Sequence, residues 1–426
     1  MARVGERAGN DERPAGPDEG PPRPPLLELA ESLPPLTDTS EALGRVADRI
    51  AAGTGPVALD AERASGYRYS QRAYLLQLRR AGAGTALVDP IAFADLTPLV
   101  AALDGTEWLL HAATQDLPCL ADLGLRPARL FDTELAARLL NLPRVGLATL
   151  VEELLGARLA KEHSAVDWST RPLPPSWLDY AALDVEVLVP LRDILARRLE
   201  EAGKASWAAE EFAALTGFIG PERRPDPWRR TSGLHRVRGR RGLAVVRELW
   251  ESRDALAADL DVAPGRLLAD SAIVEAATTM PQDRKALRSM PGMRHRHARR
   301  HVDTWSEAVE RARALPDSAL PAVSGRGDGL PPPRSWGERN PAAAARLAAC
   351  RSVLAELCAT HDLPAENLLV PERVRRLAWS PPEPLDAGTV ADVLRGAGAR
   401  EWQVGLTAEP LATALAAAAP PRVGES

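Results

Sequence analysis

The 426-residue sequence predicts a mixed α/β domain followed by two all-helical modules. Three observations support this fold class. Short apolar runs bounded by Gly and Pro follow one another between residues 55 and 112, which is typical of strands. From there to about residue 200 the pattern is mainly helical, with a brief strand candidate at Leu130 and Phe131. Beyond residue 230, apolar residues recur every three to four positions, which indicates helices.

Within the α/β region, local signals place each element. Asp38-Thr-Ser-Glu41 has the pattern of a capping box at a helix start. Ala-Gly-Ala-Gly at 81–84 suits a hairpin turn between two strands. Meandering strands followed by alternating helices and strands favour a mixed sheet with flanking helices. The expected elements are a short helix and then the capped helix within 27–50, strands ending at Asp60 and covering 72–80 and 85–90, a helix at 95–103, and a strand at 107–112.

Pro-rich segments mark the domain borders. A Pro/Arg segment at 221–230 and a Gly/Pro/Ser-rich segment at 316–333 both read as linkers. Pro264-Gly-Arg-Leu-Leu268 is similar to Pro364-Ala-Glu-Asn-Leu-Leu369, so the two helical modules suggest a diverged repeat. The predicted division is a disordered tail at 1–26, the α/β domain at 27–220, helical modules at 221–315 and 335–417 joined by a linker at 316–334, and a tail at 418–426.

Composition excludes several classes of protein. The net charge of −5 does not point to a nucleic-acid partner for the molecule as a whole, so local charge decides that question. The three cysteines form no metal-ligand or disulfide pattern, which favours a reducing, cytoplasmic location. The polar N-terminus is not a signal peptide, and no apolar run is long enough to span a bilayer.

Two acids stand at the end of the first long strand. In GPVALDAER, Asp60 and Glu62 are two residues apart, so both carboxylates project from one face of the strand. That spacing allows them to share one cation. Taken alone, a D-x-E pair at a strand end is also what a solvated turn looks like, and the motif gains weight only from the other acids.

Two further acids lie in apolar surroundings. Asp116 follows the strand EWLLHA and opens a helix, where capping the helix is the ordinary alternative role. Asp184 falls within the apolar stripe of WLDYAALDVEVLVPLRDIL, and Tyr180 is one turn earlier on the same side. Pro190 is expected to kink or restart this helix. Buried carboxylates need a compensating partner, and divalent cations bind such oxygen ligands.

The order and spacing of these motifs resemble a known family. DAE, HAATQD and YAALD are similar to the three exonuclease motifs of the DEDD superfamily in its Tyr subclass, whose catalytic domain has a ribonuclease H-like fold. Lys161-Glu-His-Ser164 and Asp167-Trp-Ser-Thr-Arg-Pro-Leu173 resemble the segment that precedes the third motif in ribonuclease D. The helical modules are similar to HRDC domains, the first more clearly than the second. Arg63 departs from the aromatic or apolar residue often found after the motif Glu, and either a phosphate contact or solvent is open to it.

The resemblance implies roles for these residues. Asp60 would bridge two Mg²⁺ or Mn²⁺ ions, with Glu62 and Asp184 completing one site and Asp116 supporting the other. The ions would activate a water and stabilise the leaving 3′ oxygen, while Tyr180 orients the water. The implied activity is that of a 3′-to-5′ exoribonuclease acting on RNA 3′ ends, such as those of tRNA precursors.

Local charge supports a nucleic-acid substrate. Residues 223–241 contain eight Arg and one Asp, and residues 284–300 contain seven Lys or Arg and no acid. Such clusters bind a phosphate backbone without sequence preference, although each alone is also an ordinary solvated surface. The candidate nucleic-acid-binding residues are Lys161, Arg171, Arg236, Arg238, Arg240, Arg241, Lys285 and Arg294.

Three other functions remain open from the sequence. A 3′-to-5′ DNA exonuclease is one, because metal ions that act on the phosphodiester do not by themselves distinguish ribose from deoxyribose. A nucleic-acid-binding protein with an inactive catalytic domain is another, although all four acids and Tyr180 are present. A protein-interaction scaffold gives no reason for buried acids. No obligate protein partner is evident.

Overall fold

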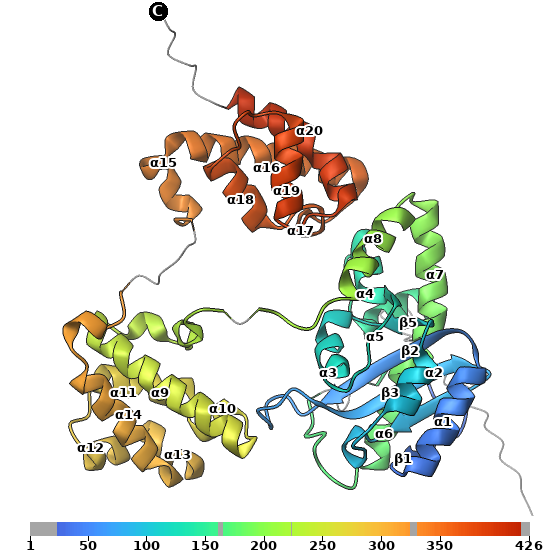
Figure 1. Cartoon of the computed structure of the whole chain (residues 1–426), viewed down its shortest axis with the longest axis horizontal. Helices are drawn as coiled ribbons and strands as arrows, with labels where there is room; N and C mark the ends of the chain where they lie inside the picture. Colours follow the sequence, from blue (N-terminus) through green and yellow to red (C-terminus); the bar gives the residue numbers. More distant parts are fainter. Residues whose placement is uncertain (1–23, 161–164, 223, 324–329, 419–426) are drawn as a thin grey trace, which may run out of the picture.

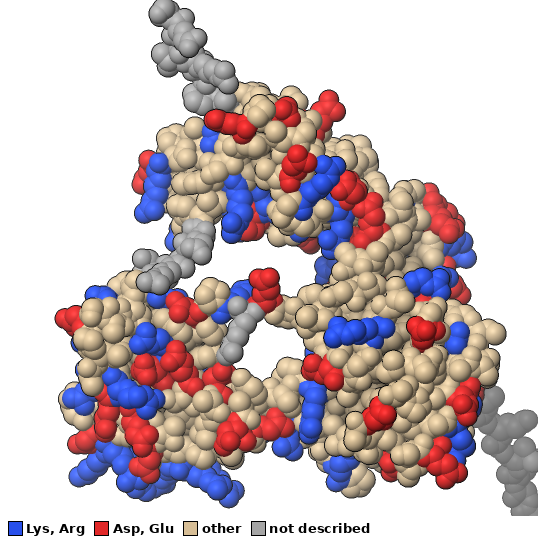
Figure 2. All heavy atoms as spheres, viewed as in Figure 1, with Lys and Arg blue, Asp and Glu red and all other residues tan. Residues whose placement is uncertain are grey.

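Three modules surround a central opening in the computed structural model of this protein, which describes residues 24–160, 165–222, 224–323 and 330–418 (Figure 1). The α/β domain lies beside both helical modules, and the space-filling view keeps an opening between the three (Figure 2). The predicted fold class is confirmed. Among the described residues, no helix is both long and apolar enough to cross a membrane.

The α/β domain is built on a six-stranded mixed sheet with strand order β1-β4-β3-β2-β5-β6. The strands β2, β3 and β4 form an antiparallel meander, and β1, β5 and β6 pair parallel to their neighbours. Gly82 and Gly84 adopt positive φ in the predicted hairpin turn. The strands are β1 (Leu36–Thr37), β2 (Thr54–Arg63), β3 (Ala73–Ala81), β4 (Gly84–Val88), β5 (Glu107–Leu110) and β6 (Arg129–Asp132).

Alternation along the strands divides the core into two layers. Leu76 and Leu78 of β3 pack in one cluster with Leu43 and Ile50 of helix α1 (Ser40–Ala52). Leu75, on the other face of β3, packs with α6 (Pro175–Glu186) in a separate cluster. Because successive strand residues point to opposite faces, helices cover both sides of the sheet. The helix α6 therefore lies over the face that carries Asp60 and Glu62.

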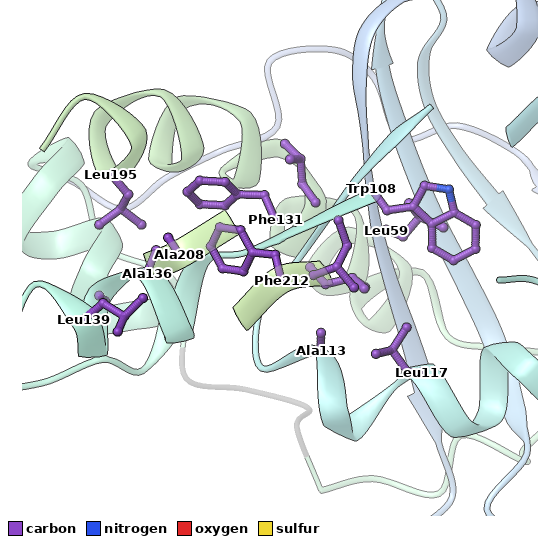
Figure 3. Packing of buried hydrophobic residues seen from close by; sticks show 14 of the residues in the cluster. Leu59, Trp108, Ala113, Leu117, Phe131, Ala136, Leu139, Leu195, Ala208 and Phe212 are labelled. Atoms are coloured by element: carbon purple, nitrogen blue, oxygen red, sulfur yellow. The ribbon is translucent and has the colours of Figure 1, made fainter. Parts of the chain in front are cut away.

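Of the remaining helices of this domain, α2 packs against α1, while α4 and α8 cover the β6 edge with α7 beside them. Phe131 of β6 and Phe212 of α8 lie with ring centroids 4.7 Å apart, near Leu195 of α7 (Figure 3). These helices are α2 (Thr97–Leu103), α3 (Leu117–Asp122), α4 (Thr133–Leu139), α5 (Leu147–Leu150), α7 (Leu188–Glu201) and α8 (Ala205–Leu215). Short 3-10 turns cover Pro90–Ala92, Ala113–Gln115, Pro227–Arg230, Leu234–Arg236, Pro291–Met293, Asp317–Ala319 and Pro333–Ser335, and a π-helical turn covers Val151–Leu155.

Local predictions near helix ends had mixed outcomes. The short helix expected at the start of 27–50 is wrong, because residues 27–35 contain no helix and Leu36–Thr37 join the sheet as β1. The capping box from Asp38 is also wrong: Thr39 caps α1, with its hydroxyl accepting from Ala42 N at 3.3 Å. The restart near Pro190 is confirmed, since α6 ends at Glu186 and α7 begins at Leu188. Pro190 thus occupies the first turn of α7, where its missing N–H costs nothing.

The two helical modules share a corner. In each, a helix of 22 or 21 residues ends at an aspartate with left-handed backbone, Asp261 (φ 47°) or Asp362 (φ 49°), before a short four-residue helix. This match supports the diverged repeat. The first module contains α9 (Gly239–Leu260), α10 (Pro264–Leu267), α11 (Asp270–Thr279), α12 (Arg284–Ser289), α13 (Arg296–Arg300) and α14 (Val302–Ala314). The second contains α15 (Trp336–Arg339), α16 (Pro341–His361), α17 (Ala365–Leu368), α18 (Pro371–Trp379), α19 (Ala387–Gly396) and α20 (Glu401–Ala417).

Both modules dock on the α/β domain through this corner. Asp261 accepts a hydrogen bond from the backbone N–H of Ser70 at 2.9 Å. Asp362 accepts one from the Asn141 side chain at 2.6 Å. The matching corners therefore present the same acceptor to two different surfaces of the α/β domain.

The second module is also clamped by a buried lysine. The Lys204 side chain lies at the start of α8, and its ammonium donates to the carbonyl oxygens of Leu139 and Asp362, each at 2.8 Å. Beside it, the rings of Trp207 and Trp402 stack with centroids 4.9 Å apart. One charged side chain thus satisfies carbonyls from both sides of the interface.

Replacing Lys204 with methionine should destabilise this interface. Methionine retains the apolar stem but leaves two carbonyls without a donor, which costs about 1–3 kcal/mol for a buried group. Denaturant unfolding should show this loss. Lys285→Met, at an exposed position of α12, serves as the control and should leave the free energy of unfolding unchanged. Equal unfolding curves for both variants would contradict the clamp.

Candidate active site

A cavity of about 230 Å³ lies at the end of β2, between this strand, α6 and the turn before α3. Its lining combines acids with a small apolar wall. The lining residues are Leu59, Asp60, Ala61, Glu62, Arg63, His111, Gln115, Asp116, Leu147, Tyr180, Asp184 and Leu188. All five residues predicted from the acidic motifs thus border one cavity.

Three of the acids converge closely. Each of Asp60, Glu62 and Asp184 offers a carboxylate oxygen, and these oxygens lie within 4.8 Å of one another. Asp60 and Glu62 come from one face of β2, as their spacing predicts. Asp184 reaches them from α6, which packs on that same face. Two elements distant in sequence therefore bring three oxygen donors to one point.

Asp116 joins this cluster instead of capping its helix. It occupies the residue before α3, yet its side chain makes no capping hydrogen bond. Its carboxyl group shares a hydrogen bond with Asp60 and lies 3.3 Å from a guanidinium nitrogen of Arg63. The alternative capping role is thereby excluded. Arg63 faces the acids and not open solvent, with 24% of its side chain exposed.

A further acid, which the sequence reasoning missed, shapes the turn before Asp116. Asp132 is 4% exposed and accepts backbone N–H groups from Ala112 at 3.1 Å and Ala113 at 2.9 Å. It also caps α4 through the N–H of Glu134 at 2.9 Å. Ala112 has a left-handed φ of 57°, which a residue other than glycine holds only under such constraint. The signal was present in Asp132-Thr-Glu134, an N-cap pattern at a helix start.

Tyr180 stands one turn before Asp184 on α6 and borders the cavity. Its hydroxyl donates a hydrogen bond to Asp184. Burial, and then the charges of Asp184 and Glu62, raise the pKa of this phenol above its ordinary value. The hydroxyl therefore stays protonated near neutral pH, which suits a donor and not a base.

The carboxyl groups resist ionisation in the metal-free protein. Burial first, and then the neighbouring carboxylates, raises the pKa of Glu62 to about 10. Burial likewise raises the pKa values of Asp116 and Asp184 well above their ordinary range, with Asp60 as the next contribution. The pKa of Asp60 is also raised, mainly by burial. Like charges in a desolvated site cannot all form without a compensating cation.

The donor set fits hard divalent cations. Carboxylate oxygens are the ligands that magnesium and manganese prefer. Arg63 supplies one positive charge against four acids, so the cluster retains room for more cationic charge. We conclude that these residues fit divalent metal ions.

Among the candidate nucleic-acid-binding residues, Arg171 has a structural role instead. Its five N–H donors are all engaged by the protein: two by the Asp89 carboxylate at 2.7 Å and three by carbonyl oxygens of Tyr74, Trp168 and Thr170 at 2.8–2.9 Å. No donor remains for a phosphate. We therefore withdraw Arg171 from the predicted set.

The other candidates separate by their contacts within the protein. Arg240 and Arg241 bond carbonyl oxygens in the stretch 312–321, so they hold the segment after α14. Arg236, Arg238, Lys285 and Arg294 are exposed and stay candidates. Lys161 lies outside the described residues.

Six exposed basic residues of the first module gather along one edge. They lie on α12, on α13 and on the turn between them, where Figure 2 shows a continuous band of Lys and Arg at the lower border of this module. We call this surface the basic edge. Its residues are Lys285, Arg288, Arg294, Arg296, Arg299 and Arg300.

Comparison with protein families assigns each module. Residues 36–200 match the model for the 3′-5′ exonuclease domain. Residues 242–309 match the HRDC domain, and residues 329–415 match the 3′ to 5′ exonuclease C-terminal domain. The second module thus matches a model of its own, while its exact borders remain predictions.

Individual relatives agree with this assignment. A ribonuclease D of Gluconacetobacter diazotrophicus is 36% identical, over 82% of this chain and 87% of the relative. A crystal structure of a protein from Bifidobacterium adolescentis has a TM-score of 0.84 at 39% identity, covering 92% of this chain and all of that one. Escherichia coli RNase D, described as an exoribonuclease involved in structured RNA processing, has a TM-score of 0.66 at 27% identity, covering 90% and 98%.

The raised pKa values predict a pH-dependent stability of the metal-free protein. In the unfolded chain, Glu62 loses its proton near its ordinary pKa of 4.5, whereas burial in the folded protein raises this pKa to about 10. The folded state thus binds more protons between these values, so stability falls as pH rises through that window. Melting temperatures measured with chelator from pH 5 to 9 should decrease, and saturating Mn²⁺ should flatten the decrease. A metal-free melting temperature that rises over this range would contradict the assignment.

Proposed function

This chain belongs to the ribonuclease D family and is a 3′-to-5′ exoribonuclease, and we propose that it trims structured RNA precursors such as those of tRNA. The observation that carries the proposal is the convergence of the Asp60, Glu62 and Asp184 oxygens beside Tyr180. A tight cluster of carboxylates at a cavity has the chemistry of a phosphodiester hydrolase that works with cations.

We propose that two divalent cations, Mg²⁺ or Mn²⁺, bind these acids. Asp60 would serve both, since it lies close to Glu62 and Asp184 and also shares a hydrogen bond with Asp116. When bound, such ions supply an activated water and stabilise charge on the leaving oxygen. The chain contributes the fixed positions of its ligands, through β2, α6 and the turn held by Asp132.

Tyr180 has a different part in the proposed reaction. Its hydroxyl is a protonated donor held beside Asp184, so it can orient a water or a phosphate oxygen by hydrogen bonding. It does not abstract the proton, because its pKa lies above the ordinary value for a phenol. Arg63, which faces Asp116, adds positive charge where a substrate phosphate would approach.

RNA would reach the cavity from the helical side of the molecule. We propose that the basic edge binds the phosphate backbone of the folded part of the substrate, while the single-stranded 3′ end enters the cavity. A related protein in Escherichia coli is described as acting in structured RNA processing, which supports this class of substrate. We also propose the cytoplasmic location and the domain borders expected from the sequence.

An inactive catalytic domain is the contrasting hypothesis. The structure assembles every predicted acid around one cavity, and among its described residues no basic side chain other than Arg63 forms an ion pair with the four acids. The assembled site favours activity. A variant at the centre of the cluster separates the two hypotheses.

Asp60→Asn should abolish cleavage while RNA binding persists. Changing a residue that only contacts a metal ligand lowers metal affinity or activity by about 10–100-fold. Loss of a central ligand should therefore lower the cleavage rate by more than about 100-fold. The assay compares end-labelled tRNA precursor and a matched DNA strand, with Mn²⁺ and with chelator. Asp104→Asn, at the exposed end of α2, is the control and should retain full activity. Wild type without metal-dependent cleavage would support the binding-protein hypothesis, and preferential DNA cleavage would refute the RNA substrate.

Removing charge from the basic edge should weaken RNA binding through its salt dependence. In the double variant Arg296→Gln and Arg299→Gln, each lost contact with a duplex phosphate should make the slope of log affinity against log salt less steep by about 0.9. Arg45→Gln with Arg49→Gln on α1 is the matched control, because that helix covers the other face of the sheet. Binding titrations at several salt concentrations provide the slopes. Equal slopes for both double variants would exclude the basic edge.

A further inference from the structure

A buried glutamine beside the acidic cluster has no partner among the described residues. Gln77 lies in the middle of β3 and its side chain is 0% exposed. Neither its amide nitrogen nor its amide oxygen has a hydrogen-bond partner there. A buried amide group without a partner is unfavourable, so its presence in the buried part of β3 requires an explanation.

The sheet places this amide next to Asp60. In the antiparallel pair of β2 and β3, Gln77 is directly opposite Asp60. Opposite residues share a face of the sheet, with Cβ atoms about 4.5–5.5 Å apart, so a glutamine side chain reaches its neighbour's carboxylate. On its other side Gln77 is opposite Leu87 of β4, which offers no polar atom from its side chain.

The covering helix closes the space above Gln77. The helix α6 packs on β2, β3 and β4 together, and Ala181 and Ala182 of α6 join Leu75 and Leu87 in one buried cluster. Along the same face of β3, Arg79 is already engaged by Glu186 and Thr85. The Asp60 carboxylate is thus the polar side chain that the strand register places directly beside the amide.

We propose that Gln77 is a positioning residue, whose amide N–H donates to the Asp60 carboxylate when that carboxylate binds a cation. The inference rests on the proposed function, because it concerns the orientation of a proposed metal ligand. By this hydrogen bond Gln77 would fix the orientation of the Asp60 carboxylate. Side chains that hydrogen-bond to metal-ligating carboxylates commonly have this effect. The cost of the buried amide in the metal-free protein is then offset on metal binding.

This role predicts opposite effects on stability and on metal binding. Gln77→Leu keeps the volume and removes the unpaired amide, so its melting temperature in chelator should equal or exceed that of wild type. The same variant should need about 10–100-fold more Mn²⁺ for half-maximal thermal stabilisation, and its kcat should fall without a matching change in the KM for RNA. Gln77→Met provides a second apolar variant if leucine packs poorly.

Gln403 offers a matched control. It is also buried, but its amide is satisfied by Asn367 O at 2.8 Å and by Arg400 N at 2.9 Å. Gln403→Leu should lower the melting temperature in chelator and in Mn²⁺ alike, and should leave the Mn²⁺ midpoint unchanged.

The experiment is a thermal-shift titration with Mn²⁺ on full-length wild type and these variants. A stable Gln77 variant with a shifted Mn²⁺ midpoint supports the proposal. An unshifted midpoint overturns it, whether the variant is stabilised or, like Gln403→Leu, destabilised. Wild type that shows no stabilisation by Mn²⁺ would instead refute the proposed metal site itself, so the two failures are distinguishable.

Discussion

Mutual repulsion between buried carboxylates is the constraint on which this molecule depends. Asp60, Glu62, Asp116 and Asp184 are held together by a strand, a turn and a helix that leave them no freedom to separate. In water such groups would ionise and move apart, but here burial and proximity keep protons on them. The four carboxyls can therefore ionise together only when positive charge compensates them. Bound divalent cations supply that charge and are also what phosphodiester hydrolysis requires.

The helical modules are attached by a repeated device. Each presents a left-handed aspartate after its long helix, and each aspartate accepts a hydrogen bond from the α/β domain. The first module docks on the segment 66–70, which follows the strand that carries Asp60. The first module, which carries the basic edge, is thereby joined to the segment that follows the strand of Asp60 and Glu62.

The sequence predicted the acids well because their information is local. Spacing on β2 placed Asp60 and Glu62 on one face, and helical periodicity placed Tyr180 with Asp184. Asp116 needed more, since its backbone position fits a helix cap and only tertiary contacts direct its side chain to Asp60. Asp132 was missed although its N-cap pattern is local, because its hydrogen bonds to Ala112 and Ala113 are tertiary contacts. Gln77 was missed because its place opposite Asp60 comes from strand pairing, which no local pattern encodes.

The basic residues show the opposite limitation. The sequence could not separate Arg171, whose donors are all engaged inside the protein, from the exposed arginines of α12 and α13. A guanidinium has five donors, and whether carbonyls or solvent surround it depends on the whole fold. Local charge in the sequence favoured a nucleic-acid partner, and the structure shows which of the basic residues are exposed.

If the acidic cluster binds divalent cations in place of protons, calorimetric titration of the full chain with Mn²⁺ near neutral pH should show saturable binding. Titrations in buffers of different ionisation enthalpy should also show a net release of protons, since carboxyls protonated in the metal-free protein must ionise to bind a cation. Absence of saturable binding, or binding without proton release, would show that cations do not replace protons at these acids.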